Sequence, residues 1–144
     1  MVLGKRRDPY GNFNFLVEID GMIEAGFSEV SGLDMETQVS EYKEGGVNTY
    51  IHKLPTQTKY SNIILKRGIT DSVELWQWQD KAAKGKVQRR SGSVILLNES
   101  GEEKVRWNFK DSWPCKWKGP VFKADGDEVA IEILEIAHEG IERV

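Results

Sequence analysis

The chain has 144 residues, of which 39% are hydrophobic and 30% are charged, and its formal net charge is −3. This length and composition exclude a disordered chain and are typical of one domain that buries a core without disulfides or metals. The weakly acidic balance argues against a nucleic-acid-binding protein, because such proteins carry strongly basic faces. We therefore expect a single domain over residues 1–144.

The N-terminal segment is polar and contains Pro9 and Gly11, so we expect residues 1–12 to form a flexible arm. A Lys-Arg-Arg run lies near its start, but no apolar run follows, so it does not resemble a Sec signal peptide. No stretch approaches eighteen consecutive apolar residues, and we expect no membrane anchor. Cys115 is the only cysteine, so no intramolecular disulfide can form.

Alternating apolar residues predict a half-buried strand over 13–19. The Asp20-Gly21 pair is typical of a hairpin turn, which would lead into a second strand over 23–30. Residues 35–42 are polar but compatible with a third strand, and the adjacent Gly45 and Gly46 then interrupt the chain. The next strand is expected over 59–67, where Gly68 ends it.

One helix is expected, over residues 71–84. Asp71 can cap its first turn, and Glu74 is placed to complete a capping box. Gly85 suits the position that follows the last helical residue. Helical spacing predicts an inward face made of Leu75, Trp76, Gln79, Ala82 and Ala83.

The C-terminal half predicts strands over 87–97, 105–117 and 129–138, with a turn over 98–101. Within the second of these, apolar residues occupy the odd positions and only Asp111 breaks the pattern. We expect a buried face made of Val105, Trp107, Phe109, Trp113, Cys115 and Trp117. Pro114 cannot donate to a ladder and belongs at an edge or a bulge.

The last strand changes its apolar phase between Ile133 and Leu134, which indicates a β-bulge there. The chain thus contains about seven strands in antiparallel hairpins and one helix. This pattern favours a mainly β fold, a two-sheet sandwich or barrel-like single domain with one flanking α-helix.

No catalytic or metal-binding pattern stands out. His52 and His138 are not spaced with other ligands as a metal site requires, and Cys115 lies between tryptophans where a core position is expected. Gly45-Gly46 lacks the lysine and hydroxyl of a phosphate loop. Lysines near the tryptophans fall on the opposite strand face, which argues against a platform for stacking single-stranded nucleic acid. We expect no enzyme, no metal and no cofactor.

Three stretches of the chain carry a family resemblance: "SEVSGLDMETQVSEYKEGGVN", "KLPTQTKYSNIILKRGITD" and "LWQW". They resemble the tail tube proteins of contractile phages and, more closely, the inner tube proteins of phage-like extracellular contractile injection systems. In that family an SGL turn leads to a Y-x-E-G-G-x-N loop, a K-L-P-G-x-x-K-Y-x-N-I-x-L-K-R-G strand and a helix with a Trp motif. The similarity runs from about Asp8 to Glu139. Thr56 stands where the family usually has glycine.

The resemblance implies a fold related to the type VI secretion tube protein, and hexameric rings that stack into a hollow tube. A contracting sheath would drive this tube through a target envelope to deliver cargo. The implied partners are further copies of the chain, a sheath protein, baseplate and terminator or cap proteins, and cargo in the lumen. The implied setting is a phage tail or injection particle that is assembled in the bacterial cytoplasm and released.

We expect the polar, glycine-hinged loop over 41–50 to contact a neighbouring subunit, with the charged strand end at or near the same contact. The expected interface residues are Glu41, Tyr42, Lys43, Glu44, Gly45, Gly46, Val47, Asn48, Lys66 and Arg67. The alternative for the loop is a solvated hairpin that caps two strands. The alternatives for the protein are a baseplate-proximal tube initiator that forms one ring, and a monomeric β-barrel ligand-binding module.

Overall fold

A computed structural model describes residues 8–22, 26–43, 45–46 and 50–144. Within these ranges the chain forms nine strands and one helix. In chain order they are β1 (Phe15–Ile19), β2 (Phe27–Ser31), β3 (Met35–Tyr42), β4 (His52–Tyr60), β5 (Ile63–Gly68), α1 (Glu74–Ala83), β6 (Arg90–Leu97), β7 (Glu103–Lys118), β8 (Ile131–Ala137) and β9 (Gly140–Arg143). The expected fold class, mainly β with two packed sheets and a single helix, is confirmed.

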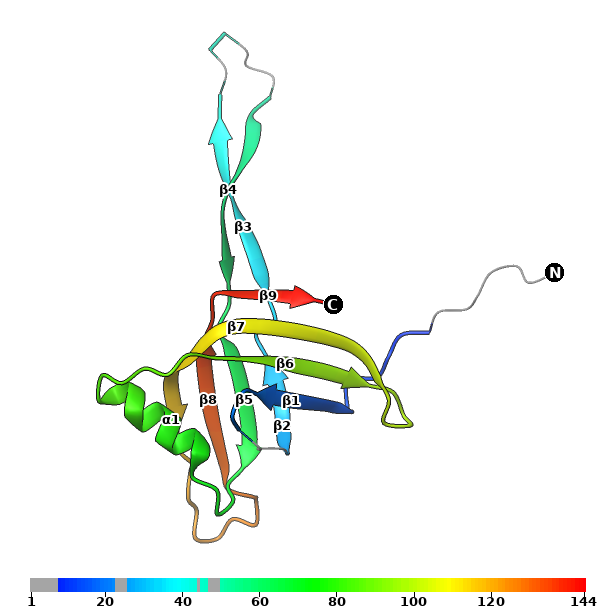
Figure 1. The fold of residues 1–144 in the computed structure, drawn as a ribbon. Coiled ribbons are helices and arrows are strands. Elements are labelled where there is room, and N and C mark those ends of the chain that lie inside the picture. Colours follow the sequence, from blue (N-terminus) through cyan, green and yellow to red (C-terminus); the bar gives the residue numbers. More distant parts are fainter. Residues whose placement is uncertain (1–7, 23–25, 44, 47–49) are drawn as a thin grey trace, which may run out of the picture.

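The body of the molecule is one long antiparallel ladder that folds over itself. Its strand order is β1-β6-β7-β8-β5-β2, with β9 also paired to β7. The first part of β7 pairs with β6 and β9, and its second part pairs with β8. Figure 1 shows β6 and the first part of β7 running across β5 and β8, so the ladder makes two crossed layers that share β7.

The core lies between these two layers and under α1. It joins Val17 and Ile19 of β1, Ile63 and Leu65 of β5, Leu75 and Trp78 of α1, Val94 of β6, Phe109 of β7, and Leu134 and Ile136 of β8, with Phe27 of β2. Trp78 is 1% exposed, and its indole Nε1 donates to the carbonyl of Gln88 at 2.7 Å. The one polar atom of this buried side chain is thereby satisfied.

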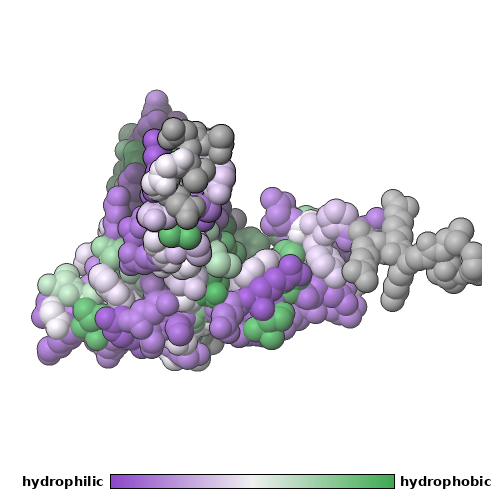
Figure 2. Space-filling view, turned by 90° about the horizontal axis from the view of Figure 1, so that it is seen from above, coloured by the Kyte–Doolittle hydropathy of each residue, from purple (hydrophilic) through white to green (hydrophobic). Residues whose placement is uncertain are grey.

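Strands β3 and β4 form a second, separate sheet of two strands. Together they project from the body as an arm (Figure 1). Figure 2, which looks down along the arm, shows mostly hydrophilic residues on this side with scattered hydrophobic ones. The predicted bounds of β3, residues 35–42, are those observed.

The expected strand over 59–67 is wrong at its start, because the chain breaks at Ser61 and Asn62, between β4 and β5. This break is where the arm leaves the body. Gly32 lies beside it with φ of 88°, and a Cβ there would stand 2.0 Å from the Asn62 carbonyl oxygen. The close crossing of two chain segments therefore requires glycine at position 32.

The turn at Asp20-Gly21 is present, with Gly21 at φ of 76°, but it does not make the predicted hairpin. Strands β1 and β2 stand at opposite ends of the ladder and pair with β6 and β5. The second strand, predicted over 23–30, begins at Phe27 and ends at Ser31, and residues 23–25 lie outside the described ranges.

The helix begins later than predicted. It runs from Glu74, its N-cap residue is Val73, and no side chain caps it, so the capping box of Asp71 and Glu74 is wrong. The Ser72 hydroxyl accepts a long hydrogen bond from the Glu74 amide at 3.5 Å. The buried face is also shifted: Leu75 and Trp78 are buried, whereas Trp76 is 49% exposed. The C-terminal prediction is confirmed, since Gly85 has φ of 81°.

The buried face of β7 changes side at Asp111, which has φ of 50°. Before it, odd residues such as Phe109 point inward; after it, Ser112 and Pro114 are buried. Of the predicted face, Val105 and Phe109 are buried, while Trp107, Trp113, Cys115 and Trp117 are only half-buried. The predicted bulge at Pro114 is confirmed, because the register with β8 shifts between Pro114 and Lys116.

The predicted bulge in the last strand is wrong. Pairing of β8 with β5 is continuous, and Glu132, Leu134 and Ile136 are all buried. The apolar phase appeared to change because Glu132, a charged residue, occupies an inward position.

Strand β9 was not expected from the sequence. Within the described residues, no helix is long and apolar enough to cross a bilayer, and no group of three His, Cys, Asp or Glu could hold a metal ion.

Candidate assembly surfaces

The arm is a two-stranded ribbon without a core of its own. All eight residues of β3 are exposed, and in β4 only the two end residues are partly covered. Several large apolar side chains therefore stand in solvent on the arm and its tip: Met35 (67% exposed), Val39 (61%), Tyr42 (54%), Tyr50 (54%), Ile51 (42%) and Leu54 (50%). Because isolated hairpins are at best marginally stable in water, this ribbon needs a packing partner.

Side-chain pairs across the arm fix its register. Thr37 and Thr58 hydroxyls lie 2.8 Å apart, and the Thr56 hydroxyl donates to the Gln38 carbonyl at 2.9 Å. Glu36 stands opposite Lys59, and Glu41 stands opposite Lys53. Such pairs each add a few tenths of a kcal/mol to about 1 kcal/mol, which specifies the pairing but does not replace a core.

Five of the ten predicted interface residues lie at the arm's tip within the described part of the chain. Glu41 and Tyr42 end β3, and Tyr42 and Tyr50 pack against His52, with ring centroids 6.2 and 4.9 Å apart. Gly46 has φ of 87°, and a Cβ there would meet nothing within 4 Å. Lys43 and Gly45 are exposed, while Glu44, Val47 and Asn48 lie outside the described residues. Contact of this tip with another subunit stays a prediction.

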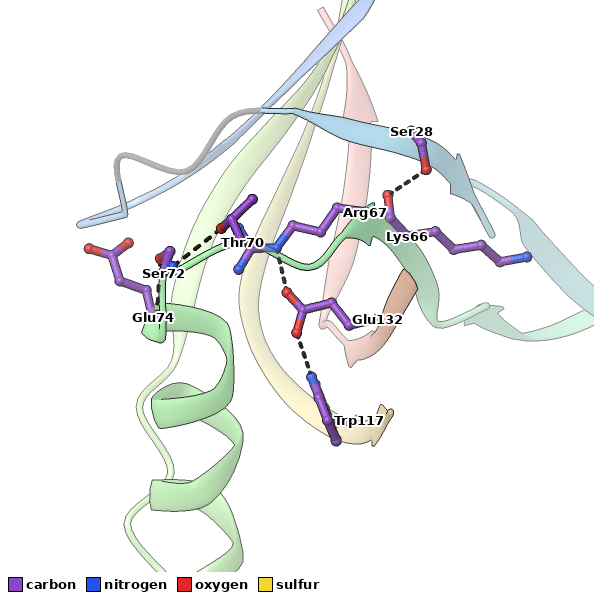
Figure 3. Close-up of polar contacts among 8 residues, drawn as sticks. All are labelled: Ser28, Lys66, Arg67, Thr70, Ser72, Glu74, Trp117 and Glu132. Carbon is purple, nitrogen blue, oxygen red and sulfur yellow. Dashed lines mark hydrogen bonds and ion pairs between the residues drawn. The ribbon is translucent and has the colours of Figure 1, made fainter. Parts of the chain in front are cut away.

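The structure does not bring Lys66 and Arg67 to the tip: the end of β5 and the tip lie at opposite ends of the molecule (Figure 1). Arg67 is 2% exposed within the subunit, and its Nε pairs with Oε1 of Glu132 at 2.5 Å. The other carboxylate oxygen of Glu132 accepts from the Trp117 indole at 3.1 Å (Figure 3). These contacts favour a structural role for Arg67 inside the subunit.

Lys66 faces the other side of the sheet and is half-buried. It pairs with Glu29 of β2 at 2.8 Å, and the Ser28 hydroxyl donates to the Lys66 carbonyl at 3.2 Å (Figure 3). The rings of Trp117 and Trp76 of α1 also pack edge-to-face, with their centroids 4.8 Å apart. The charged end of β5 thus contacts β2 through Lys66 and β8 through Arg67, and Glu132 and Trp117 extend this set of contacts to β7 and α1. These contacts join residues far apart in the chain, so the sequence alone could not show them.

Cys115 is half-buried in the bulge of β7, and its thiol lies 3.4 Å from the Glu135 carbonyl. Burial, with the nearby Glu135 carboxylate, raises the pKa of this thiol. A raised pKa is the reverse of what a nucleophilic cysteine needs. The geometry therefore offers no activated nucleophile at this residue.

A further exposed segment, which sequence reasoning did not single out, is the β7–β8 connection. Residues 121–129 are all exposed, and Phe122 is 82% exposed. The signal in the sequence was an apolar pair, Val121-Phe122, next to a run of acidic residues. No element was predicted over 121–128, because strand periodicity stops there.

The sequence profile of the T4-like virus tail tube protein gp19 family matches residues 11–142. The chain belongs to this tail tube family. The match spans both sheets, α1 and the whole arm, so the family assignment applies to the fold as described. Among curated proteins, none matches the chain by sequence.

Solved structures of tail tube-like chains share this fold. A chain in the extended sheath–tube complex of PVC, an extracellular contractile injection system, is 26% identical, with a TM-score of 0.85 and coverage of 94% of this chain and 91% of that one. A chain in the six-fold symmetrised baseplate of the anti-feeding prophage is 23% identical, with a TM-score of 0.87 and coverage of 96% and 97%. Hcp1 from Flavobacterium johnsoniae, at 18% identity and a TM-score of 0.56 over 89% and 94%, has a related fold.

Proposed function

We propose that the chain is the building block of the inner tube of a contractile injection particle. Six copies form a ring, rings stack into a hollow tube, and a sheath around the tube drives it into a target envelope to deliver cargo. The role is structural and involves no catalysis. The sheath, the baseplate and a terminator or cap are its partners, since similar chains occur in structures of a sheath–tube complex, a baseplate, a terminator and a cap.

The observation that carries this proposal is the coreless arm on a well-packed body. A two-stranded ribbon in which all of β3 and residues 53–59 of β4 are exposed requires an external partner. Strands β1 and β2 also end the ladder with open edges, which natural proteins normally protect or pair. Both features suit a protein that completes its sheets against further copies of itself.

The test is the state of the purified chain. Light scattering after size exclusion should show a species of about six subunits or larger stacks, and electron microscopy should show six-fold rings or tubes. A strict monomer at high concentration, and in the native particle, would contradict the proposal. Single rings that never stack would favour a baseplate-proximal ring over the tube body.

A further inference from the structure

The two ends of strand β6 carry charges of opposite sign. Before the strand, the last turn of α1 and the connection to β6 present four exposed cations: Lys81, Lys84, Lys86 and Arg89. After the strand, the turn to β7 and the first residue of β7 present three exposed acids: Glu99, Glu102 and Glu103. We call residues 81–89 the basic end and residues 98–103 the acidic end.

The strand holds the two ends too far apart to neutralise one another. β6 has eight residues, and at about 3.3 Å per residue it spans roughly 26 Å. Charges in solvent are screened over about 8 Å at physiological salt. Figure 1 shows the basic end at one side of the body and the acidic end at the other. Each end is therefore compensated only by the residues next to it.

This local compensation is incomplete at both ends. In the basic end, Lys84 pairs with Asp80 at 2.7 Å, and in the acidic end, Glu103 pairs with Arg106 at 2.6 Å. The charged residues of the two ends that form no ion pair in the described part of the chain are Lys81, Lys86 and Glu99. Each end thus keeps charge that a partner of opposite sign can meet.

An apolar hollow of about 530 Å³ lies beside the acidic end, between the edge strands β1 and β2. Its apolar lining consists of Phe15, Val30, Leu33, Val94, Leu96 and Trp107. The side-chain amide of Asn14 donates to the Asn98 carbonyl at 2.8 Å, which joins the start of β1 to the acidic end. The basic end presents an apolar side chain of its own, because Val87 is 46% exposed.

We infer that the basic end of one copy docks on the acidic end of a second copy, with Val87 against the apolar hollow. The inference rests on the proposed function, because it names two surfaces through which copies of the chain meet. A second copy fits because this chain carries both halves of the contact on opposite flanks. The opposite charges fix the partner and the register, and the apolar contact contributes affinity.

The direction of β6 indicates which neighbour is contacted. In Figure 1, β6 crosses β5 and β8 and lies crosswise to the arm, so its two ends lie on opposite flanks of the body. Copies placed side by side bring the basic end of one to the acidic end of the next. Such a contact is heterologous, joining different surfaces of the two partners, and it produces a closed ring when the rotation closes. The contact therefore belongs within a ring.

Two other roles for the basic end are a solvated surface and a seat for a different protein with an acidic face, such as the sheath. In the first case, the sign of the charge has no effect on assembly. In the second, reversing the acidic end leaves rings intact. Docking between copies requires both ends, and it requires that their signs be opposite.

Charge reversal at each end tests this requirement. We expect Lys81→Glu/Lys86→Glu to reduce the fraction of ring-sized species at least tenfold in light scattering at moderate salt. Glu99→Lys/Glu102→Lys should have the same effect, because each variant then has two ends of like sign. Val87→Ser should reduce rings at least threefold. All five side chains are exposed, so the thermal melting of the dissociated chain should change little.

Mixing the two reversed variants gives a sharper test. Both ends of one variant are acidic and both ends of the other are basic, so every contact is restored in a ring where the two alternate. An equimolar mixture should recover most of the parental rings, although neither variant forms them alone. A defect in folding, or the loss of a sheath contact, is not repaired in this way.

The matched control is Lys110→Glu/Lys123→Glu, which changes the net charge equally at exposed residues outside both ends, and it should assemble like the parent. Loss of rings in this control would show that net charge alone governs assembly and would overturn the contact. Rings at the parental level in either reversed variant, or no recovery on mixing, would also overturn it while the parent's own rings upheld the proposed function. A parent that never forms rings would overturn both.

Discussion

At the scale of single residues, Arg67 departs most from its expected role. Its place at a charged strand end suggested a surface contact, yet it is 2% exposed and paired with Glu132, which is itself buried. Sequence alone could not show this, because the two partners are on different strands that pair only in the folded chain. The alternation of β5 did contain a hint, since Ile63, Leu65 and Arg67 share one face.

Removing one partner of this pair should destabilise the subunit strongly. Arg67→Leu leaves the Glu132 carboxylate buried without its counter-ion, and we expect a loss of about 3–5 kcal/mol in the free energy of unfolding. Arg67→Met combined with Glu132→Leu should recover most of that loss, because an apolar pair needs no compensating charge. Urea denaturation of both variants, in the same assembly state, measures this. Equal stability of Arg67→Leu and the parent would show that Glu132 is solvated.

The aromatic residues of β7 should differ in importance according to the turn at Asp111. Phe109 is 2% exposed within the core, so Phe109→Ala should cost about 3–5 kcal/mol of stability. Trp113 follows Asp111 and is only half-buried, so Trp113→Ala should cost clearly less, although tryptophan is the larger residue. Chemical denaturation compares the two. The reverse order would mean that the odd-numbered face continues through Asp111.

At the scale of elements, strand bounds and buried faces were predicted correctly only where no charged residue lies inside the strand at an inward or left-handed position. β3 was predicted with its observed bounds because no buried charge disturbs its pattern. In β8, the inward Glu132 shifted the apparent apolar phase and suggested a bulge that is absent. In β7, the positive φ of Asp111 exchanged the two faces, and no local rule predicts such a residue outside a turn.

The helix shows a similar limit. Asp71 and Glu74 have the spacing of a capping box, but the helix begins at Glu74 and the connection from β5 occupies residues 69–73. The position of α1 is set by Leu75 and Trp78, which pack into the core. Tertiary packing therefore decided which turn became helical, and the capping pattern was secondary.

The tip of the arm gives a prediction for an element with few contacts of its own. Replacing Gly45-Gly46 by Val-Val strains the backbone, since Gly46 has φ of 87°, and Lys43→Glu reverses an exposed charge. We expect both variants to keep the circular dichroism of the folded subunit and to form fewer rings or tubes. Assembly at the parental yield in both would favour a solvated hairpin. Loss of the fold itself would mean that the tip supports the subunit.

At the scale of the whole molecule, the chain divides into a crossed two-layer body and an arm with different sources of stability. The body buries apolar side chains from β1, β2, β5, β6, β7, β8 and α1. The arm relies on a ladder of hydrogen bonds with exposed side chains on both of its faces. The two-sheet class could be inferred from strand patterns. The projection of β3 and β4 could not, because exposed strands give the same polar pattern whether they extend from a sheet or lie on its edge.

This division predicts where assembly changes local stability. In dissociated subunits, backbone amides of β3 and β4 should exchange with deuterium much faster than those of β5 and β8, because no core resists local opening of the arm. In assembled rings or tubes, exchange in β3 and β4 should slow by at least tenfold, while exchange in β5 and β8 should change little. Mass spectrometry of peptides from both states measures the difference. Equal protection of the arm's amides in the two states would show that the ribbon is stable alone. The exposed arm would then no longer support the proposal that the chain assembles with further copies.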